Sequence, residues 1–263
     1  MSESPLRVEQ PSDGVLLLTL DLPERRNAMT AELTEAWVAA VEGVRRNPEA
    51  RAVVVTGAGS AFCAGGDLSW LGESPDLTVA QLRDRMLPFY RAWLSVRTLD
   101  IPVVAAVNGA AVGAGLCLAL ACDLRLASTR ATFSAPFVRL GIHAGMAATF
   151  LLPEAVGVPR ARELLLTGRR VDADEALRIG LCESVHEPDD VVAAAVAVAE
   201  QIAGNAPVAV RLTKAALAFA GHRSIEEALA WEAVAQPVTM ATRDLHEGLA
   251  AQGERRAAVF TGR

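Results

Sequence analysis

Apolar residues near the start of the chain form two short runs with a helically spaced segment between them. The runs are Val15–Leu20 and Val53–Thr56, and their length and apolar character predict two buried strands. Between the runs, apolar residues recur every three or four positions, at Leu33, Trp37, Val41 and Val44. This spacing predicts a helix, and Thr30 stands where the N-cap of that helix would lie.

The same alternation continues through the middle of the chain. We predict further strands at Pro102–Val107, Leu124–Ala127 and Ala131–Phe133, and further helices at Gln81–Arg97, Gly113–Ala121 and Ala147–Val156. From Pro188 onward the sequence is rich in alanine and almost wholly helical in pattern. Because strand–helix repeats come first and helices last, we expect an α/β core over residues 1–200 and a helical C-terminal region over residues 201–263.

One segment is apolar enough to raise the question of a membrane span. Ile101–Cys122 contains no charged residue over 22 positions, which is long enough to cross a bilayer. The segment is interrupted by Pro102, by Asn108 and by three glycines. We therefore interpret it as a buried strand, a tight turn and a buried helix.

Composition excludes several classes of function. The chain has 263 residues, 52% of them hydrophobic, and a formal net charge of −6, so it has material for a full core and no overall basic surface for nucleic acid. The cysteines and the four histidines do not have zinc-ligand spacing, and we expect no metal. Scattered cysteines and the lack of an N-terminal apolar stretch predict a cytoplasmic protein without a membrane partner.

Two glycine turns are the first candidates for chemistry. One strand leads into Cys63–Asp67, which contains Gly65 and Gly66, and another leads through Asn108 into Gly113–Gly115. The first N–H groups of a helix have no intrahelical acceptor and lie at the positive end of its dipole. Two such groups aimed at one point would form an oxyanion hole. By itself the spacing supports a glycine turn and no more, because purely structural turns are commoner than oxyanion holes.

Several motifs in order along the chain carry a resemblance to a known family. They are Arg26-Asn27-Ala28-Met29, Ala61-Phe62-Cys63-Ala64-Gly65-Gly66-Asp67-Leu68, Ile101 to Gly109, Gly113-Ala114-Gly115, Cys122-Asp123 and Leu166-Thr167-Gly168-Arg169. The chain resembles the enoyl-CoA hydratase/isomerase (crotonase) family over nearly its whole length. The resemblance implies a spiral of ββα turns with a helical C-terminal region that builds trimers, often paired into hexamers.

The same resemblance implies a substrate and its contacts. The substrate would be an acyl-CoA thioester, with coenzyme A as part of the substrate and no covalently bound cofactor. The backbone N–H groups of Gly66 and Ala114 would hold the thioester oxygen. Coenzyme A would lie against the first glycine turn and a second loop, through Arg26, Ala28, Ala64, Gly65, Asp67 and Leu68, and Arg255 would lie near its phosphates.

The sequence departs from the family at two positions that usually carry glutamate. Cys117 and Phe137 stand there, so the chain is an atypical member in which both residues would line the acyl pocket. His143 is the candidate acid or base by sequence position, although a lone histidine is more often structural. Glu73 and Asp76, in the loop after the first glycine turn, are weaker candidates.

Three functions remain open from the sequence. The first is an enzyme, nominally an enoyl-CoA hydratase, or an isomerase, hydrolase or decarboxylase that uses other proton-transfer groups. The second is an acyl-CoA-binding protein without catalysis, and the third is an oligomeric scaffold. The intact glycine turns favour the first two over the third.

Overall fold

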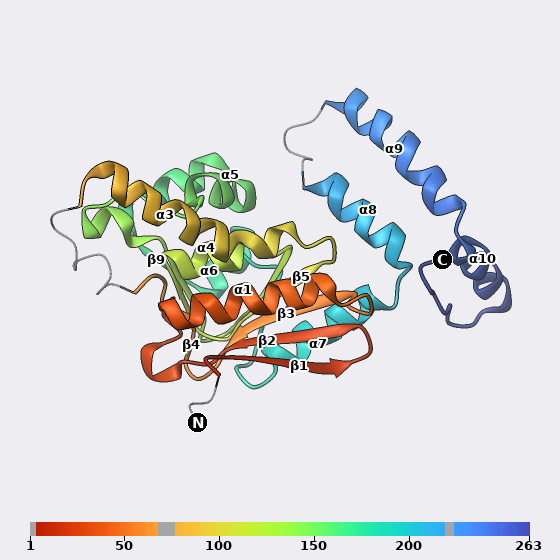
Figure 1. Ribbon diagram of the computed structural model, residues 1–263, viewed down its shortest axis with the longest axis horizontal. Helices are drawn as coiled ribbons and strands as arrows, with labels where there is room; N and C mark the ends of the chain where they lie inside the picture. Colours follow the sequence, from red (N-terminus) through yellow and green to blue (C-terminus); the bar gives the residue numbers. More distant parts are fainter. Residues whose placement is uncertain (1–3, 68–76, 219–223) are drawn as a thin grey trace.

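Six strands form the larger of two sheets (Figure 1) in the computed structural model, which describes residues 4–67, 77–218 and 224–263. In spatial order the strands are β1 (Leu6–Ser12), β2 (Val15–Leu20), β3 (Ala52–Gly57), β5 (Val103–Val107), β7 (Leu124–Ser128) and β10 (Ser184–His186). The strand β1 runs antiparallel to β2, and all other neighbours are parallel. The predicted strands of this sheet are confirmed, and β1 and β10 add its edges.

A second sheet is built from strands of three residues each. Its order is β4 (Ala61–Cys63), β6 (Ala110–Val112), β8 (Thr132–Ser134) and β9 (Arg170–Asp172), with β9 antiparallel to β8. Along the chain, β3, β5 and β7 of the first sheet are followed by β4, β6 and β8 of the second. The chain therefore winds through both sheets once per repeat, which is the ββα spiral that the motifs imply.

Helices cover the sheets and form the C-terminal region. They are α1 (Ala31–Arg46), α3 (Val79–Leu94), α4 (Ala114–Ala121), α5 (Ala148–Thr167), α6 (Ala173–Arg178), α7 (Val191–Ala203), α8 (Pro207–Leu217), α9 (Ile225–Met240) and α10 (Arg243–Glu254). The helix predicted to reach Arg97 ends at Leu94 and continues as the 3-10 turn η2 (Ser95–Thr98). The helix predicted to end at Val156 runs on to Thr167, across a break at Gly157.

The helix α3 is held against α1 by aromatic packing. The Thr30 side chain caps α1 by accepting a hydrogen bond from the Leu33 N–H at 3.1 Å, as predicted. Trp37 of α1 stacks on Trp93 of α3, with 5.2 Å between ring centroids and 15° between ring planes. The Trp93 Nε1–H donates to the Thr34 hydroxyl at 3.0 Å. Because both indoles are fully buried, this contact fixes the C-terminal half of α3.

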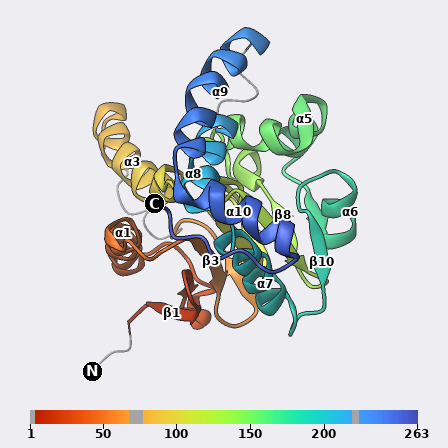
Figure 2. The same cartoon turned by 90° about the vertical axis from the view of Figure 1, so that its right-hand side faces the viewer.

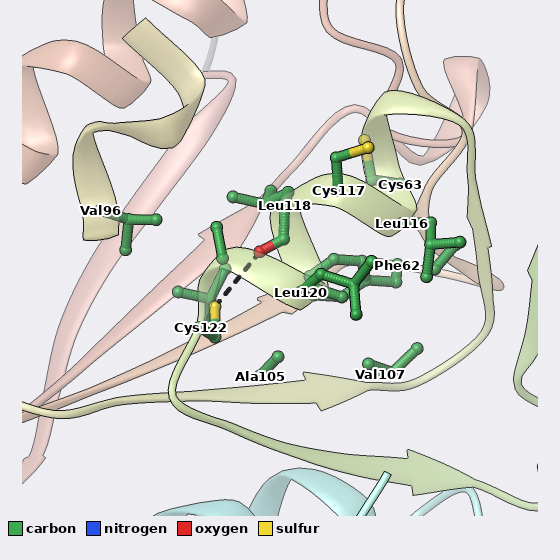
Figure 3. Close-up of a cluster of buried hydrophobic side chains, with 14 of the residues drawn as sticks. Phe62, Cys63, Val96, Ala105, Val107, Leu116, Cys117, Leu118, Leu120 and Cys122 are labelled. Atoms are coloured by element: carbon green, nitrogen blue, oxygen red, sulfur yellow. Dashed lines mark hydrogen bonds between the residues drawn. The ribbon is translucent and has the colours of Figure 1, made fainter. Parts of the chain in front are cut away.

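The uncharged segment Ile101–Cys122 lies in the protein core as β5, β6 and α4. All eight residues of α4 are buried, and Figure 3 shows the helix beside Ala105 and Val107 of β5, with Cys117 on the side away from them. No single described helix is long and apolar enough to cross a membrane; α7 and α8, bent by 110°, pass as a pair on length and composition alone. The interpretation of the segment as strand, turn and helix is confirmed.

The last helices extend away from the sheets (Figure 1), and Figure 2 shows α8, α9 and α10 from that side. The Lys214 ammonium of α8 ties them to the core by donating to the Asp123 carboxylate at 2.7 Å and to the Ile101 carbonyl at 2.8 Å. This region exposes large apolar side chains at Leu217, Ile225, Leu229, Val234, Val238, Met240, Leu249 and Val259. The boundary between core and C-terminal region at residue 200 stays a prediction. The helix α7, which spans this position, packs on the larger sheet.

Candidate active site

Two loops run side by side at the first glycine turn. The Ala64 N–H donates to the Arg26 carbonyl at 2.9 Å, and the Met29 N–H donates to the Gly65 carbonyl at 2.8 Å. Ala28 and Ala64 are half-buried, and Arg26 is exposed. The predicted coenzyme A contacts on these loops therefore form one continuous ledge of backbone and small side chains.

Buried Asn27 fixes this ledge. Its side-chain oxygen accepts from the Leu22 N–H at 2.9 Å, and its side-chain nitrogen donates to the Ala58 and Ala61 carbonyls at 2.9 and 2.8 Å. Arg26 and Asn27 have φ of 52° and 55°, a left-handed conformation that costs free energy in residues other than glycine. Three hydrogen bonds to one fully buried amide hold the loop in that conformation.

Asp67, at the end of the ledge, forms an ion pair with Arg25. Its carboxylate accepts from the Arg25 guanidinium at 2.7 Å. Residues 68–76, which follow Asp67, lie outside the described residues. The predicted contact at Leu68 and the candidates Glu73 and Asp76 fall in this range.

The two glycine turns meet at Gly65. A methyl carbon placed on Gly65 would lie 2.5 Å from the Val112 carbonyl oxygen and 3.3 Å from the Ala114 backbone nitrogen, and Gly65 has a φ of 94°. Ala114 is the first residue of α4. Among the described residues, no backbone acceptor is found for the N–H of Gly66 or of Ala114. Two unbonded N–H groups thus lie on neighbouring backbone segments.

Phe137 and Cys117 both lie near this helix start. The Phe137 ring is 3.8 Å from the position of a methyl carbon on Gly113, so it packs against the first turn of α4. The Cys117 Sγ, one turn further along α4, donates to the Gly145 carbonyl at 3.7 Å. Burial raises the pKa of the Cys117 thiol to about 12. At neutral pH this thiol keeps its proton, so it is neither a base nor a nucleophile.

Cys63 packs beneath the first glycine turn. Its Sγ donates to the Asn27 carbonyl at 3.0 Å, and burial raises its pKa to about 12. Gly115 lies directly against it, because a methyl carbon there would overlap the Cys63 carbonyl oxygen. Close backbone approach between α4 and β4 is what brings the two turns together.

Two further predicted residues have exposed side chains. The His143 side chain is exposed, with Nδ1 2.7 Å from the Ala144 carbonyl oxygen. Arg255 is the exposed C-cap of α10, and Figure 1 places α10 at the opposite end of the molecule from β4. Within one chain, Arg255 therefore does not join the other predicted contacts.

Tyr90 of α3 is a residue that the sequence predicted only as part of the helix pattern. A methyl carbon on Gly145 would overlap its hydroxyl group. Burial raises the pKa of Tyr90, the neighbouring Met146 backbone lowers it by less, and the Cys117 thiol raises it to a smaller extent. No sequence signal separates Tyr90 from its helix neighbours, because the contact depends on a segment distant in the chain.

Within the described residues, no cluster of side chains suggests a metal site, and one sizeable cavity lies apart from the glycine turns. Residues 4–67, 77–218 and 224–263 contain no group of three or more metal-ligating side chains. A cavity of about 550 Å³ lies between the end of α4 and α8, against Leu120, Asp123 and Lys214. It is separate from the ledge and the helix start described above.

The chain is similar in sequence and in structure to known enoyl-CoA hydratases. A sequence model of the enoyl-CoA hydratase/isomerase family matches residues 10–263. The chain is 40% identical over 262 residues to (E)-benzylidenesuccinyl-CoA hydratase from Thauera aromatica, covering 95% of this chain and 97% of that protein. It is 35% identical to short-chain-enoyl-CoA hydratase from Clostridium acetobutylicum, over 92% of each. A solved enoyl-CoA hydratase from Bacillus anthracis superposes with a TM-score of 0.92 at 34% identity, over 98% of this chain and 100% of that one, which confirms the predicted fold class.

Proposed function

Because the chain belongs to the enoyl-CoA hydratase/isomerase family, we propose that it is an enzyme whose substrate is an acyl-CoA thioester held at its carbonyl oxygen by the N–H groups of Gly66 and Ala114. The observation that carries this proposal is the meeting of the two glycine turns, with a methyl position on Gly65 only 3.3 Å from the Ala114 nitrogen. Both N–H groups lack a backbone acceptor among the described residues.

The chemistry of thioesters explains why two such donors matter. Adding a group to an unsaturated thioester, or moving a proton beside its carbonyl, places negative charge on the carbonyl oxygen. Donors fixed in advance stabilise that charge more than they stabilise the neutral carbonyl. One donor of this kind contributes about 2.7–4 kcal/mol to the transition state.

The specific reaction that we propose for this enzyme is hydration of an enoyl-CoA. Relatives named as hydratases support it, whereas the residues beside the helix start do not supply the usual carboxylate pair. Cys117 keeps its proton at neutral pH, and Phe137 has none to give. Isomerase, hydrolase or decarboxylase chemistry, and acyl-CoA binding without turnover, are therefore the alternatives to be tested beside hydration.

Coenzyme A would lie on the ledge formed by Arg26, Ala28, Ala64, Gly65 and Asp67. The ledge presents small side chains and backbone beside the exposed guanidinium of Arg26, which suits a long flexible ligand with phosphates at one end. Coenzyme A is then part of the substrate, and the proposal needs no further cofactor.

We also propose a trimer, or a pair of trimers, assembled through the C-terminal region. The apolar side chains exposed on α8, α9 and α10 support this, because such a surface is unusual on a monomer. In a trimer Arg255 would approach coenzyme A from a neighbouring copy. Light scattering of the purified chain tests the assembly, and a monomeric mass would contradict it.

The proposed donor at Ala114 can be removed by a single substitution. Proline has no N–H, yet it is favoured at the first position of a helix, which Ala114 occupies in α4. With crotonyl-CoA, Ala114→Pro is expected to lower kcat about 10²- to 10³-fold while leaving the far-ultraviolet circular dichroism unchanged.

Val79→Pro is the matched control. Val79 is also the first residue of a helix, α3, and is 84% exposed, so it loses an equivalent N–H that no proposed contact uses. It is expected to keep full activity. Equal activity of the two variants would contradict the role of Ala114. Tight acyl-CoA binding by the wild type, with no turnover across enoyl, dienoyl and β-hydroxyacyl thioesters, would favour the binding protein.

A further inference from the structure

The Tyr90 side chain reaches the candidate site from a rigid support. Trp93 lies three residues further along α3, on the same face of the helix, and is clamped by its stack on Trp37 and its hydrogen bond to Thr34. Tyr90 itself is half-buried. Its hydroxyl therefore has a defined position rather than that of a mobile surface group.

The hydroxyl lies at the segment that also faces Cys117. It packs so closely on Gly145 that a methyl carbon there would overlap it, and the Cys117 Sγ donates to the Gly145 carbonyl at 3.7 Å. Cys117 follows Ala114 by three residues of α4, a rise of about 4.5 Å along the helix axis. The hydroxyl thus lies beyond the proposed oxyanion donor, on the side where the family pattern would place a carboxylate.

The phenol of Tyr90 is in its protonated form. Burial, the larger effect, raises the pKa of Tyr90, whereas the Met146 backbone lowers it. The phenol therefore stays protonated at neutral pH. Its neighbour Cys117 also stays protonated, and Phe137 carries no ionisable group.

We propose that the Tyr90 hydroxyl donates the proton that an enolate intermediate takes up at its α carbon. This role rests on the proposed function, since it needs a thioester bound at Gly66 and Ala114. The phenol O–H bond breaks as the α carbon–hydrogen bond forms, and the electron pair on the enolate oxygen returns to the carbonyl double bond. The phenolate then recovers a proton from solvent water.

Transfer of the proton from the Tyr90 phenol to the α carbon of the enolate is energetically favourable. The α hydrogen of a thioester is a much weaker acid than a phenol, so the proton moves to the stronger base. The Met146 backbone, which lowers the pKa of Tyr90, favours the phenolate that this step leaves behind. Protonation of an enolate is the last step of both hydration and decarboxylation. The proposed role of Tyr90 therefore applies to either overall reaction.

A single tyrosine makes the contact directly measurable. The chain contains one tyrosine, so a protein carrying an isotope-labelled tyrosine ring gives one phenol-carbon NMR resonance, and it belongs to Tyr90. Butyryl-CoA, a saturated thioester that cannot be hydrated, is expected to shift this resonance in step with its binding isotherm. Free coenzyme A, which lacks the acyl group, is expected to leave it in place.

The functional test follows exchange of the α hydrogens of butyryl-CoA in alkaline deuterium oxide, because removal of an α hydrogen needs the phenolate form of Tyr90. The same group that protonates the enolate removes the proton in reverse, so Tyr90→Phe is expected to slow exchange by about 10²-fold or more. Affinity for butyryl-CoA and the thermal unfolding midpoint should stay close to wild type. Thr34→Val is the structural comparison, because it removes the hydrogen-bond partner of Trp93 and should lower stability with a smaller effect on exchange.

The outcomes separate the two proposals. No binding of butyryl-CoA overturns the proposed function and with it the role of Tyr90. Binding with an unmoved Tyr90 resonance overturns the role of Tyr90 alone, as does wild-type exchange in a folded Tyr90→Phe variant. A loss of exchange matched by an equal loss of stability, as expected for Thr34→Val, would assign Tyr90 a structural role instead.

Discussion

Replacing Gly65 with alanine should destabilise the fold and displace the Gly66 N–H at the same time. The added methyl carbon would lie 2.5 Å from the Val112 carbonyl oxygen, a contact that real side chains do not make, so one backbone segment must move. The φ of 94° at Gly65 adds strain, because residues with a side chain rarely adopt it. Both effects act where the two glycine turns meet.

The expected cost follows from these two effects. A side chain held at an unfavourable positive φ costs about 1–3 kcal/mol. Forcing a methyl group into a packed contact costs about 1–3 kcal/mol more. The sum, about 2–6 kcal/mol, is a large part of the roughly 5–15 kcal/mol by which a domain is stable. We therefore expect Gly65→Ala to fold with a much lower urea midpoint and to lose most of its activity on crotonyl-CoA.

Gly43 provides the matched control with the opposite sign. It lies inside α1, where a methyl carbon would meet no atom within 4 Å. Gly43→Ala should gain about 0.5–1 kcal/mol from better helix propensity, with unchanged activity. Urea unfolding followed by circular dichroism measures both variants. A Gly65→Ala protein as stable as the wild type, or one fully active despite lower stability, would refute the reasoning.

Two further predictions concern the atypical site and its thiols. Introducing both missing carboxylates, Cys117→Glu with Phe137→Glu, should raise kcat/KM for hydration of crotonyl-CoA by about 10²-fold; no gain in a folded double variant would mean that the pocket shape has also diverged. Burial raises the pKa of Cys63, Cys117 and Cys122 from 9.0 to about 12, so the protonated thiols contribute stability below pH 9 that is lost as the pH rises toward 12. Urea midpoints should therefore fall between pH about 8 and about 10.5, with a shallower fall in Cys63→Ala; equal slopes for the two proteins would contradict the assignment.

The sequence predicted the longer elements because their packing is periodic. The four apolar positions of α1 recur at helical spacing, and all four are buried. The runs that became β3 and β5 are continuous because both faces of a parallel strand are covered. The strands β4 and β6 were missed as separate elements, since three residues carry no period and each is defined by its neighbour in the second sheet.

The sequence carried signals for the backbone of the candidate site and not for its side chains. The family resemblance pointed to Gly66 and Ala114, and glycine stands at position 65, where the two backbone segments come close. No sequence signal marked the hydroxyl of Tyr90, since its contact with Gly145 depends on how α3 lies across the chain. His143 was favoured by its position in the sequence, and its exposed side chain has Nδ1 2.7 Å from the Ala144 carbonyl oxygen. Its catalytic role stays a prediction.

The buried Asn27 amide has a consequence for how tightly a ligand can bind. It joins Leu22, Ala58 and Ala61, so the ledge beside Gly65 is already rigid when the site is empty. A ligand that settles on a preformed surface does not have to immobilise that surface, and the entropy of ordering it was lost when the chain folded. Asn27→Ala should therefore weaken coenzyme A binding through an entropy term in calorimetry, although Asn27 itself is fully covered.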